Sequence, residues 1–531
     1  MPHEGISVVS GFCASTRRAK YIFLILQNNK NKKKQRQMEM ENYSGIKAAV
    51  EGIFADAADF REREITLGRL RLSVMYISNY SSKRMITEYI ISPVCRAYEE
   101  GAFSGDNERK FSPEAAITCA SVSDIADKDE AKEAILEGSC LVIYAYGDGD
   151  CRMLSVSTKN EDGRSVTEPE TENVIRGAHE GFVESGEQNA MLLRRRLKTE
   201  RLKKIDLQIG RLTKTAVSVM YIDGIADKNV INELLSRLRA IKADSILDSG
   251  YIELYIQDGG CSLYPTVGNS ERPDKVAAKM LEGRAAVIVD GSPVVLTVPY
   301  LFCEALQVTE DYSKSVFYSC FVRLLRFVAM TTGIYLPALF VALTVWHPSL
   351  LPAAFEEALL KSREGMRFSI FAEVILIFLL FEIVREVGLR MPKAVGSAVG
   401  LVGSLILGES AVKAGIASST VMVFVALAAI CNFIAPPYMN PNVIYRLAMI
   451  LAAGAFGLFG FSAALALSIL SFCSKKSFGV PYLYPLAPMD FSAMQDSIFM
   501  LPVWKMKYSP SALSGKRMIR TCGRKKEDTE R

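Results

Sequence analysis

Histidine and tryptophan are scarce in this chain, which has three histidines and two tryptophans among its 531 residues. A histidine triad or a histidine-rich metal site therefore has little material to be built from. The eleven cysteines are scattered from Cys13 to Cys522 without any CxxC pair, so a zinc site is not expected. Scattered cysteines of this kind are typical of reduced thiols facing a cytoplasmic compartment. We expect no cofactor and no enzymatic activity.

A strong excess of charge of one sign is also missing. The formal net charge is +5 and only 23% of the residues are charged, so no domain is basic enough to suggest a nucleic-acid partner. Half of the residues are apolar, which excludes a disordered chain. The two kinds of residue occupy different parts of the sequence. Charges interrupt short apolar runs from about residue 39 to 309, whereas residues 310–473 are hydrophobic in long blocks.

The first 38 residues form a basic leader in this interpretation. Its one apolar run, Tyr21–Leu26, lies between clusters of lysine and arginine. Such a run is too short for the core of a signal peptide or for a membrane span. We expect a disordered leader over residues 1–38, and Met38 or Met40 is an alternative start.

An internal repeat organises the next part of the chain. Ser73–Ile77 (SVMYI) recurs as Ser218–Ile222, 145 positions later. Leu136-Glu137-Gly138 and Val142-Ile143 recur at the same offset. Two distant blocks that share one offset predict two related α/β modules in tandem, at 39–185 and 186–309. Each module is expected to contain an apolar strand, an amphipathic helix and a later hairpin, which in the second copy turns at Asp290–Pro293.

The hydrophobic part predicts a multi-span helical membrane domain over residues 310–473. Three runs are long enough to cross the hydrocarbon core: Phe327–Trp346, Phe368–Val384 and Ile416–Ala435. Val443–Cys473 is either one long tilted helix or two short ones, and the glycine-rich run 394–407 is re-entrant or broken, which gives four to six spans. Arg323 and Arg326, together with a basic tail over 474–531, favour a cytoplasmic location for both ends.

A few charges interrupt these hydrophobic blocks and are candidates for a channel or gating role. A carboxylate in lipid is costly, so it usually faces a pore, a partner or a counter-charge. Ion or proton conduction and structural pairing, for example of Glu382 with Arg385, both remain open. Arg446 is a distant candidate partner for Glu373 or Glu409. The candidates are Glu373, Glu382, Arg385, Glu409 and Arg446.

Two polar, loop-like stretches stand out in the tandem modules. They are 176–182 (RGAHEGF) and 269–274 (NSERPD). Contact between modules or subunits is the favoured interpretation, ahead of ligand contact and of catalysis, because no nucleophile and base are placed together. The candidate contact residues are Arg176, His179, Glu180, Glu271, Arg272 and Asp274.

Several of these motifs, in this order, resemble the GerA family of spore germinant receptor A subunits. The resemblance covers about residues 40 to 490. Its most specific parts are Asn173–Arg196 (NVIRGAHEGFVESGEQNAMLLRRR), Asn269–Asp274, and Leu281–Arg284 leading to Val289–Pro293. Further matches are Glu310–Tyr312, Arg323–Arg326, Glu382–Leu389 and Gly479–Tyr482.

The resemblance implies a location, partners and a mode of action. It implies a multi-pass protein of the spore inner membrane, with the soluble N-terminal domain on the cytoplasmic side. It also implies a transporter-like B subunit and a lipoprotein C subunit as partners, besides membrane lipid. A ring-shaped homo-oligomer that forms a ligand-gated ion channel is the expected mode of action, triggered by nutrients. A secondary transporter subunit and a membrane scaffold are the alternatives.

Overall fold

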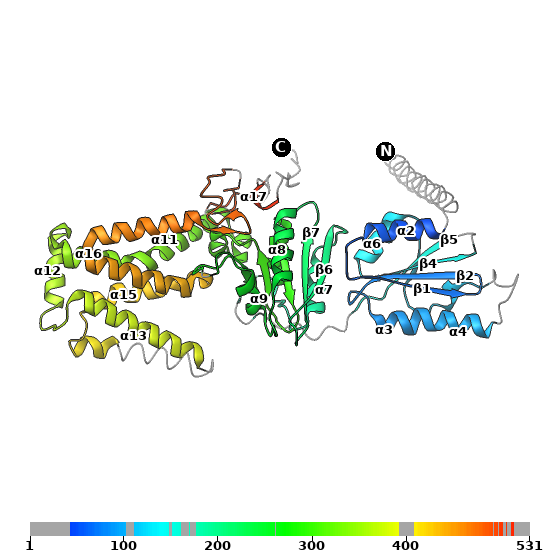
Figure 1. The fold of residues 1–531 in the computed structure, drawn as a ribbon, viewed down its shortest axis with the longest axis horizontal. Helices are drawn as coiled ribbons and strands as arrows, with labels where there is room; N and C mark the ends of the chain where they lie inside the picture. The colour runs from blue at the N-terminus through cyan, green and yellow to red at the C-terminus, as the bar shows by residue number, and fades with distance from the viewer. Residues whose placement is uncertain are drawn as a thin grey trace, which may run out of the picture.

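The structure of this protein is a computed structural model. It describes residues 43–101, 111–147, 151–160, 169, 172, 177–260, 262–391, 408–491, 493–497, 499–502, 506 and 511–514. The expected leader over 1–38 lies outside these residues. Three bodies follow one another along the long axis of the molecule (Figure 1). They are a first α/β module, a second α/β module and a helical domain.

The first module is a five-stranded antiparallel sheet in the order β1-β2-β4-β5-β3. Helices cover both of its faces (Figure 1). The alternate residues of β2 and β4 therefore lie in two separate cores, Met75 with α2 and α6, and Val74 with η1 and α4. The elements are α2 (Tyr43–Ile53), β1 (Phe60–Leu67), β2 (Leu70–Ile77), α3 (Lys83–Met85), η1 (Ile86–Ile91), α4 (Ser92–Glu100), α5 (Pro113–Ala116), β3 (Val122–Ile125), α6 (Lys128–Leu136), β4 (Cys140–Tyr146) and β5 (Cys151–Val156).

The second module repeats this topology in the order β6-β7-β9-β10-β8. Its helix α8 has the expected apolar stripe, and Val230, Leu234 and Leu238 are buried against the sheet. The elements are α7 (Gly186–Arg196), β6 (Leu202–Ile209), β7 (Thr215–Ile222), α8 (Lys228–Ala240), α9 (Ser249–Ile256), β8 (Gly268–Ser270), α10 (Pro273–Leu281), β9 (Ala285–Val289) and β10 (Val295–Val298).

The repeated stretches occupy equivalent positions in the two modules. Ser73–Ile77 lies in β2 and Ser218–Ile222 in β7, each the second strand of its sheet. Met75 packs in the core that contains α6, the helix before the hairpin of β4 and β5. Met220 packs in the core that contains α10, the helix before the hairpin of β9 and β10. The sequence repeat is therefore a repeat of the complete sheet order.

One buried ion pair joins the two modules. Arg194 in α7 donates from Nη2 to Asp59 Oδ1 at 2.7 Å and also bonds to Asp59 through Nε. The backbone N–H of Ala58 donates to the Lys204 carbonyl at 3.0 Å beside this pair. Both charged side chains are buried, so the contact fixes the start of β1 against α7 and β6.

A short linker leads from the second module to the helical domain. The linker contains η3 (Phe302–Leu306) and η4 (Thr309–Ser313). The helical elements that follow are α11 (Val316–Val341), η5 (Ala342–Trp346), η6 (Pro348–Leu350), α12 (Ala353–Ser362), α13 (Ile370–Arg390), α15 (Ser419–Asn432), η7 (Pro436–Tyr438) and α16 (Met439–Ser474). We call the end of this domain that faces the second module the junction end, and the opposite end the distal end.

Two stretches of the described chain are long and apolar enough to cross a membrane. They are Val316–Trp346 and Pro436–Ser474. The expected span Phe368–Val384 lies mostly in α13, which starts at Ile370 and has too many charged side chains to pass by composition. The expected span Ile416–Ala435 contains α15, which has only 14 residues. The run 394–407 lies outside the described residues. The expectation of four to six spans is therefore not established by length and composition.

Helix α16 is folded back on itself as a helical hairpin. Tyr445 and Phe472 stack with their ring centroids 6.0 Å apart, and the Tyr445 hydroxyl lies 3.3 Å from Ser471 Oγ. In a continuous helix, residues 27 positions apart are separated by about 40 Å. The chain turns at Gly457, which has φ 60° and ψ −138°. Of the two alternatives left open for 443–473, the structure has two short helices, an outgoing arm and a return arm.

The turn of this hairpin lies at the distal end. Trp346, the last residue of η5, donates from Nε1 to the Gly454 carbonyl at 3.0 Å. The return arm then brings Phe472 next to Phe302 in the linker, with the two ring centroids 5.6 Å apart. Both ends of α16 thus lie at the junction end, beside the second module.

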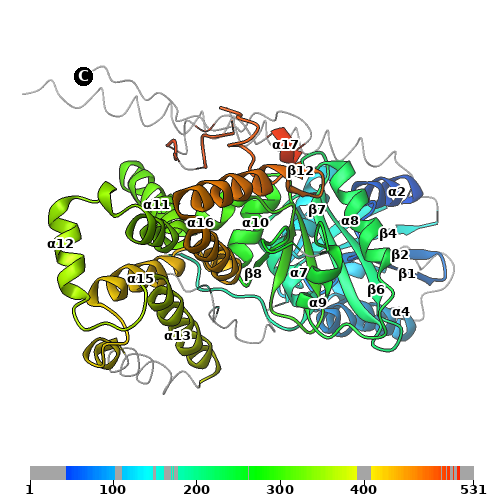
Figure 2. The same cartoon turned by 60° about the vertical axis from the view of Figure 1, so that its left-hand side comes forward.

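The chain after α16 packs against the second module. Residues 475–502, which we call the C-terminal strap, contain β11 (Lys476–Ser477) and β12 (Val480–Pro481), and α17 (Ser511–Ser514) follows. Phe478, Val480 and Leu513 are buried in the core formed by α8, α9 and the sheet, and β12 and α17 lie close to α8 and β7 (Figure 2). Over its described residues up to 514, the expected tail 474–531 is folded, because its apolar side chains complete that core.

Candidate functional site at the junction

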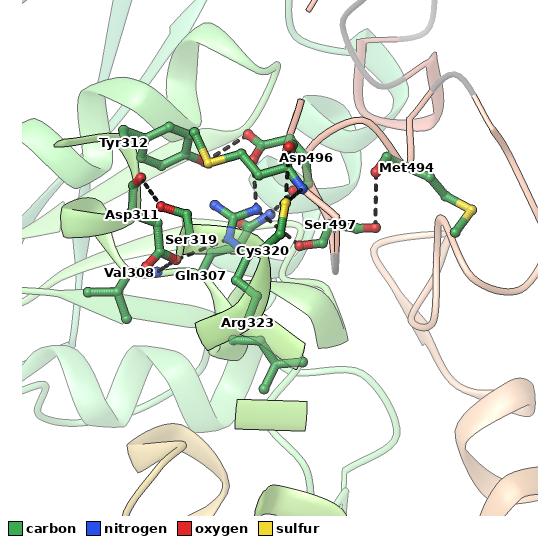
Figure 3. Close-up of polar contacts among 12 residues, drawn as sticks. Gln307, Val308, Asp311, Tyr312, Ser319, Cys320, Arg323, Met494, Asp496 and Ser497 are labelled. Carbon is green, nitrogen blue, oxygen red and sulfur yellow. Dashed lines mark hydrogen bonds and ion pairs between the residues drawn. The ribbon is translucent and has the colours of Figure 1, made fainter. Parts of the chain in front are cut away.

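A buried arginine joins three parts of the chain at the junction end. Arg323, near the start of α11, has no exposed surface. Its Nε donates to Asp311 Oδ2 of the linker at 3.0 Å, and its Nη1 donates to Asp496 Oδ1 of the C-terminal strap at 2.9 Å. Nη1 also donates to the Ser497 carbonyl at 3.0 Å. Figure 3 shows these contacts, which tie linker, helix and strap together.

Asp311 is shared between two arginines. Arg326, one turn further along α11, donates to Asp311 through Nη1 at 2.7 Å and through Nη2 at 3.0 Å. The Asp311 backbone carbonyl accepts from Ser319 Oγ at 2.7 Å. Burial alone would raise the pKa of Asp311, but the hydrogen bonds and charges of Arg326 and Arg323 outweigh it and lower the pKa below its ordinary value. The linker carboxylate is therefore held ionised.

Asp496 is the less compensated of the two carboxylates. It accepts from Arg323 and from the Tyr312 hydroxyl, whose oxygen lies 2.7 Å from Oδ2. Gln307 donates to its backbone carbonyl. Burial raises the pKa of Asp496 above its ordinary value, and Arg323 offsets only part of this effect. Next to it, Cys320 of α11 contacts the backbone of Met500, with Sγ 3.3 Å from the amide nitrogen.

A second buried charge cluster lies on the module side of the linker. Glu304 in η3 pairs with Lys279 Nζ at 2.8 Å and with Arg284 Nη2 at 2.9 Å. Its Oε1 also accepts from the backbone N–H of Leu301 at 2.9 Å. Burial would raise the pKa of Glu304, but Arg284 and Lys279 outweigh it and lower the pKa. The linker is thus anchored by one carboxylate to the second module and by another to α11.

Aromatic side chains fill the space between these clusters and α16. Tyr264 of the second module packs on Tyr438 and Phe472, with ring centroids 5.2 Å and 4.6 Å away. The Tyr264 hydroxyl donates to Asn442 Oδ1 at 2.7 Å. The Tyr482 hydroxyl of the strap donates to the Tyr438 hydroxyl at 3.0 Å. Module, helical domain and strap therefore share one hydrogen-bonded core.

Glu373 lies in the first turn of α13 at the distal end and is fully buried. Arg363 Nη1 lies 2.9 Å from its Oε1, and Oε2 accepts from the backbone N–H and the hydroxyl of Ser418, each at 3.1 Å. Ser418 is the N-cap of α15. The structure therefore gives Glu373 a structural pairing that joins the starts of two helices, with a partner that sequence reasoning did not identify.

The other channel candidates do not form one cluster with Glu373. Glu382 pairs with Arg385, with Oε2 and Nε 2.8 Å apart. Arg446 is buried and donates to backbone carbonyls, from Nε to Gly333 at 2.6 Å and from Nη2 to Ala428 at 3.2 Å. Glu409 pairs with Lys413 on the surface of its helical turn. Arg446 is therefore held by the backbones of α11 and α15, and not by Glu373 or Glu409.

The candidate contact residues that the structure describes lie in the second module or in the segment that leads into it. Glu180 pairs with Arg195 and Arg196 of α7. Arg272 is buried and donates to Asp274 through Nε at 3.0 Å and Nη2 at 2.6 Å. The Glu271 carbonyl accepts from Phe182 N at 2.7 Å. His179 lies in the segment before Phe182, and Arg176 lies outside the described residues.

Sequence reasoning missed the residues that make the inter-body contacts. Asp59 and Arg194 join the modules, and Asp311 and Asp496 join linker and strap to α11. A signal for the second contact was present, since Arg323 and Arg326 stand one helical turn apart at the start of an apolar helix. Their carboxylate partners could not be assigned, because one of them lies 173 positions away.

The groups at this site form a buried network of ion pairs that connects parts of the chain. A buried, paired network of this kind has few alternative arrangements and is costly to break. Within the described residues, no group of three or more histidine, cysteine, aspartate or glutamate side chains could hold a metal ion. The network can therefore hold the second module, the linker and α11 in one geometry.

Comparison with known proteins gives a consistent family match. The family model described as Bacillus/Clostridium GerA spore germination protein matches residues 48–512. "Spore germination protein KA" of Bacillus subtilis (strain 168) is 34% identical over 470 residues, 87% of this chain and 85% of the relative. "Uncharacterized membrane protein YfkQ" of the same organism is 33% identical over 477 residues, 89% of this chain and 91% of the relative.

One solved structure is also similar. It is the crystal structure of the N-terminal domain of the A subunit of the Bacillus megaterium spore germinant receptor GerK3. The sequences are 31% identical, the match covers 49% of this chain and 95% of that chain, and the TM-score is 0.38.

Proposed function

This chain belongs to the Bacillus/Clostridium GerA family of spore germination proteins, and on that premise we propose that it is the A subunit of a nutrient germinant receptor. It acts without catalysis, in the spore inner membrane, with its two-module domain on the cytoplasmic side. Its partners are a transporter-like B subunit, a lipoprotein C subunit, membrane lipid and further copies of itself.

The junction is the observation that supports a signalling role. Asp311 and Glu304 anchor one short linker at both ends, to α11 and to the second module respectively. In this proposal a displacement of the modules reaches α11 through buried ion pairs, because the linker is fixed at both of its ends. Arg323 and Arg326 at the start of this helix also favour the cytoplasmic side for the junction end.

We further propose that an oligomer of this chain conducts ions. Arg446 is the most suitable candidate for a residue of the conduction or gating path. Its guanidinium is buried between α11 and α15, and among the described residues no carboxylate lies within ion-pair distance of it. Glu382 and Arg385 lie on the neighbouring helix α13 and remain candidates with it. Glu373 and Glu409, each already paired, are proposed to hold helices in place during gating.

The contact set of the second module is proposed to face a neighbouring subunit. Arg272 and Asp274 pair at the start of α10, and Glu180 and His179 lie in the segment that precedes α7. Glu180 holds this segment to the end of α7 through Arg195 and Arg196. Glu271 and Arg176 belong to the same two stretches of sequence.

The transporter alternative has less support in the geometry. Transporters of that kind bind solute at helices that are broken near the middle of the membrane. The break in α16 at Gly457 lies instead against Trp346, at the distal end of the helical domain. We therefore keep the channel subunit as the proposed function.

Spores that lack their own copy of this gene provide the test. We expect the wild-type chain to restore nutrient-triggered ion release, and Glu382→Gln and Glu373→Gln to slow it. Glu357→Gln, an exposed residue of α12 paired with Lys361, is the matched control and should behave as wild type. A wild-type chain that fails to restore ion release in these spores would contradict the proposal. A wild-type chain that supports only solute uptake when reconstituted in liposomes would contradict it as well.

A further inference from the structure

A groove of about 490 Å³ lies at the junction end, between the second module and α16. One wall is the loop that follows α9, and the other is the end of the return arm with Tyr445 of the outgoing arm. Most of the residues that line it are polar or charged. Those used here are Ser262, Tyr445, Ser471, Ser474, Lys475 and Lys476.

Lys475 brings a half-buried positive charge into this groove. Its Nζ donates to Ser262 Oγ at 3.0 Å and lies 5.3 Å from the centroid of the Tyr264 ring. Within the described part of the chain, no carboxylate lies within ion-pair distance of Lys475 or of Lys476. Burial lowers the pKa of Lys475, and no acidic group opposes this effect. A desolvated cation without a counter-ion is an unfavourable arrangement that an anionic ligand would relieve.

The carboxylate on the groove wall is already engaged. Asp258 Oδ1 accepts from Arg237 Nη2 at 2.7 Å, and Oδ2 accepts from the backbone N–H of Phe478 at 2.7 Å. Its charge is balanced by Arg237 and is directed to the strap. The two lysines therefore set the sign of the groove, which is positive.

Apolar surface continues from the groove along the return arm. Leu467 and Leu470 are 67% and 64% exposed, and they lie within about one turn of Ser471. Leu263 lines the groove from the module side and is 43% exposed. A polar, basic pocket that adjoins an apolar helix face matches the two ends of a phospholipid, and it matches a free anion less well.

We propose that this groove binds the phosphate of an anionic phospholipid, with Lys475 and Lys476 as cationic groups and the serine hydroxyls as donors. The acyl chains lie along the return arm of α16. Because the groove touches the module loop, the strap and α16 together, the bound lipid becomes part of the junction. The proposal rests on the proposed function, since it needs the junction end to lie at a membrane surface.

Native mass spectrometry of the full chain in dodecyl maltoside tests this directly. Phosphatidylglycerol and phosphatidylcholine with identical acyl chains are the probes. We expect the wild-type chain to retain phosphatidylglycerol about fivefold better, the effect of one lysine near an anionic surface, and Lys475→Gln to remove the preference. Lys361→Gln at the distal end is the matched control and should keep it.

Three results would overturn the lipid site. The first is an unchanged preference in Lys475→Gln, which would leave Lys475 the ordinary role of a cation after a helix C-terminus. The second is equal retention of both lipids by the wild type. The third is complete displacement of phosphatidylglycerol by inorganic phosphate, which would indicate a site for free anions. Ser262→Ala serves as a milder second variant if Lys475→Gln does not fold.

Carbonate extraction of cell membranes separates this proposal from the proposed function. A chain that carbonate releases is not inserted, and the receptor proposal then fails together with the lipid site. A chain that stays in the membrane and shows no lipid preference contradicts the lipid site alone.

Discussion

One guanidinium, that of Arg323, holds both Asp311 of the linker and Asp496 of the C-terminal strap. The two carboxylates differ in how well they are compensated. Asp311 has two arginine partners and an exposed fraction of 1%, whereas Asp496 has one arginine and one tyrosine and an exposed fraction of 18%. This difference makes the network testable residue by residue.

Asp311→Ala is expected to be the more damaging of the two substitutions. It leaves Arg326 without a carboxylate and Arg323 with Asp496 as its single acidic partner, and removal of one partner from a buried ion pair costs about 3–5 kcal/mol. Asp496→Ala should cost about 1–3 kcal/mol, because Arg323 keeps Asp311 and loses only one charged hydrogen bond. Chemical unfolding of the full chain in detergent, followed by circular dichroism, measures both.

Asp244→Ala is the control for these two variants. Asp244 pairs with Arg211 on the surface, with both side chains more than half exposed, so its loss should cost at most about 1 kcal/mol. An Asp496 variant that is less stable than the Asp311 variant would show that the strap contact contributes more to the stability of the network than the linker contact does.

The same two carboxylates should respond to acid in opposite directions. The folded-state pKa of Asp311 lies below its unfolded value, so its stabilisation is present above the unfolded pKa and is lost as the pH falls through the folded pKa. The folded-state pKa of Asp496 is raised, so ionised Asp496 costs stability, and protonation removes that cost as the pH falls through its raised pKa. Thermal unfolding between neutral pH and about pH 4, near the ordinary pKa of aspartate, compares wild type with Asp311→Asn and Asp496→Asn.

We expect the Asp496→Asn variant to lose its difference from wild type on acidification above pH 4. The Asp311→Asn variant should stay less stable than wild type over the whole of that range. The stabilities of this variant and of wild type should become equal only below it. Parallel pH curves for all three proteins would contradict the assignment of these shifts.

The repeat and several of its strands and helices could be predicted, because both are encoded in local sequence. Alternating apolar residues define β2 and β7, and one constant offset relates Ser73–Ile77 to Ser218–Ile222. The helix α8 and the hairpin of β9 and β10 followed from periodicity and from the turn at Asp290–Pro293.

The junction could not be predicted, because its contacts join residues far apart in sequence. Nothing in the vicinity of Asp496 marks it as the partner of Arg323. The sequence predicts a basic tail over 474–531, whereas Phe478 and Val480 of the strap complete the core of the second module. The fold of α16 was hidden for a different reason: a uniformly apolar run has no pattern that distinguishes one helix from two.

Cys320 offers a direct readout of strap release. Its Sγ lies 3.2 Å from the Met500 carbonyl oxygen and 3.3 Å from the Met500 nitrogen, so the attached strap shields it. We expect Asp496→Ala to raise the rate of maleimide labelling at Cys320 about tenfold, the change produced by about 1.4 kcal/mol less protection against local opening. Peptide mass spectrometry measures the rate, and the exposed Cys473 of the same chain is the internal reference. Equal acceleration at Cys473 would mean general unfolding and would count against a strap that opens on its own.

Gly457→Ala tests whether the hairpin of α16 is required. The backbone at Gly457 has a φ of 60°, which side chains rarely adopt, and an added Cβ would lie 2.8 Å from Cγ of Trp346. Strain of this kind costs about 1–3 kcal/mol, and Trp346 would also lose its position beside the Gly454 carbonyl. Gly388→Ala in α13, where an added Cβ meets nothing within 4 Å, is the matched control and should leave the thermal midpoint in detergent unchanged or slightly higher. If Gly457→Ala is as stable as this control, the two arms are not held by that turn, and α16 must be treated as one continuous span.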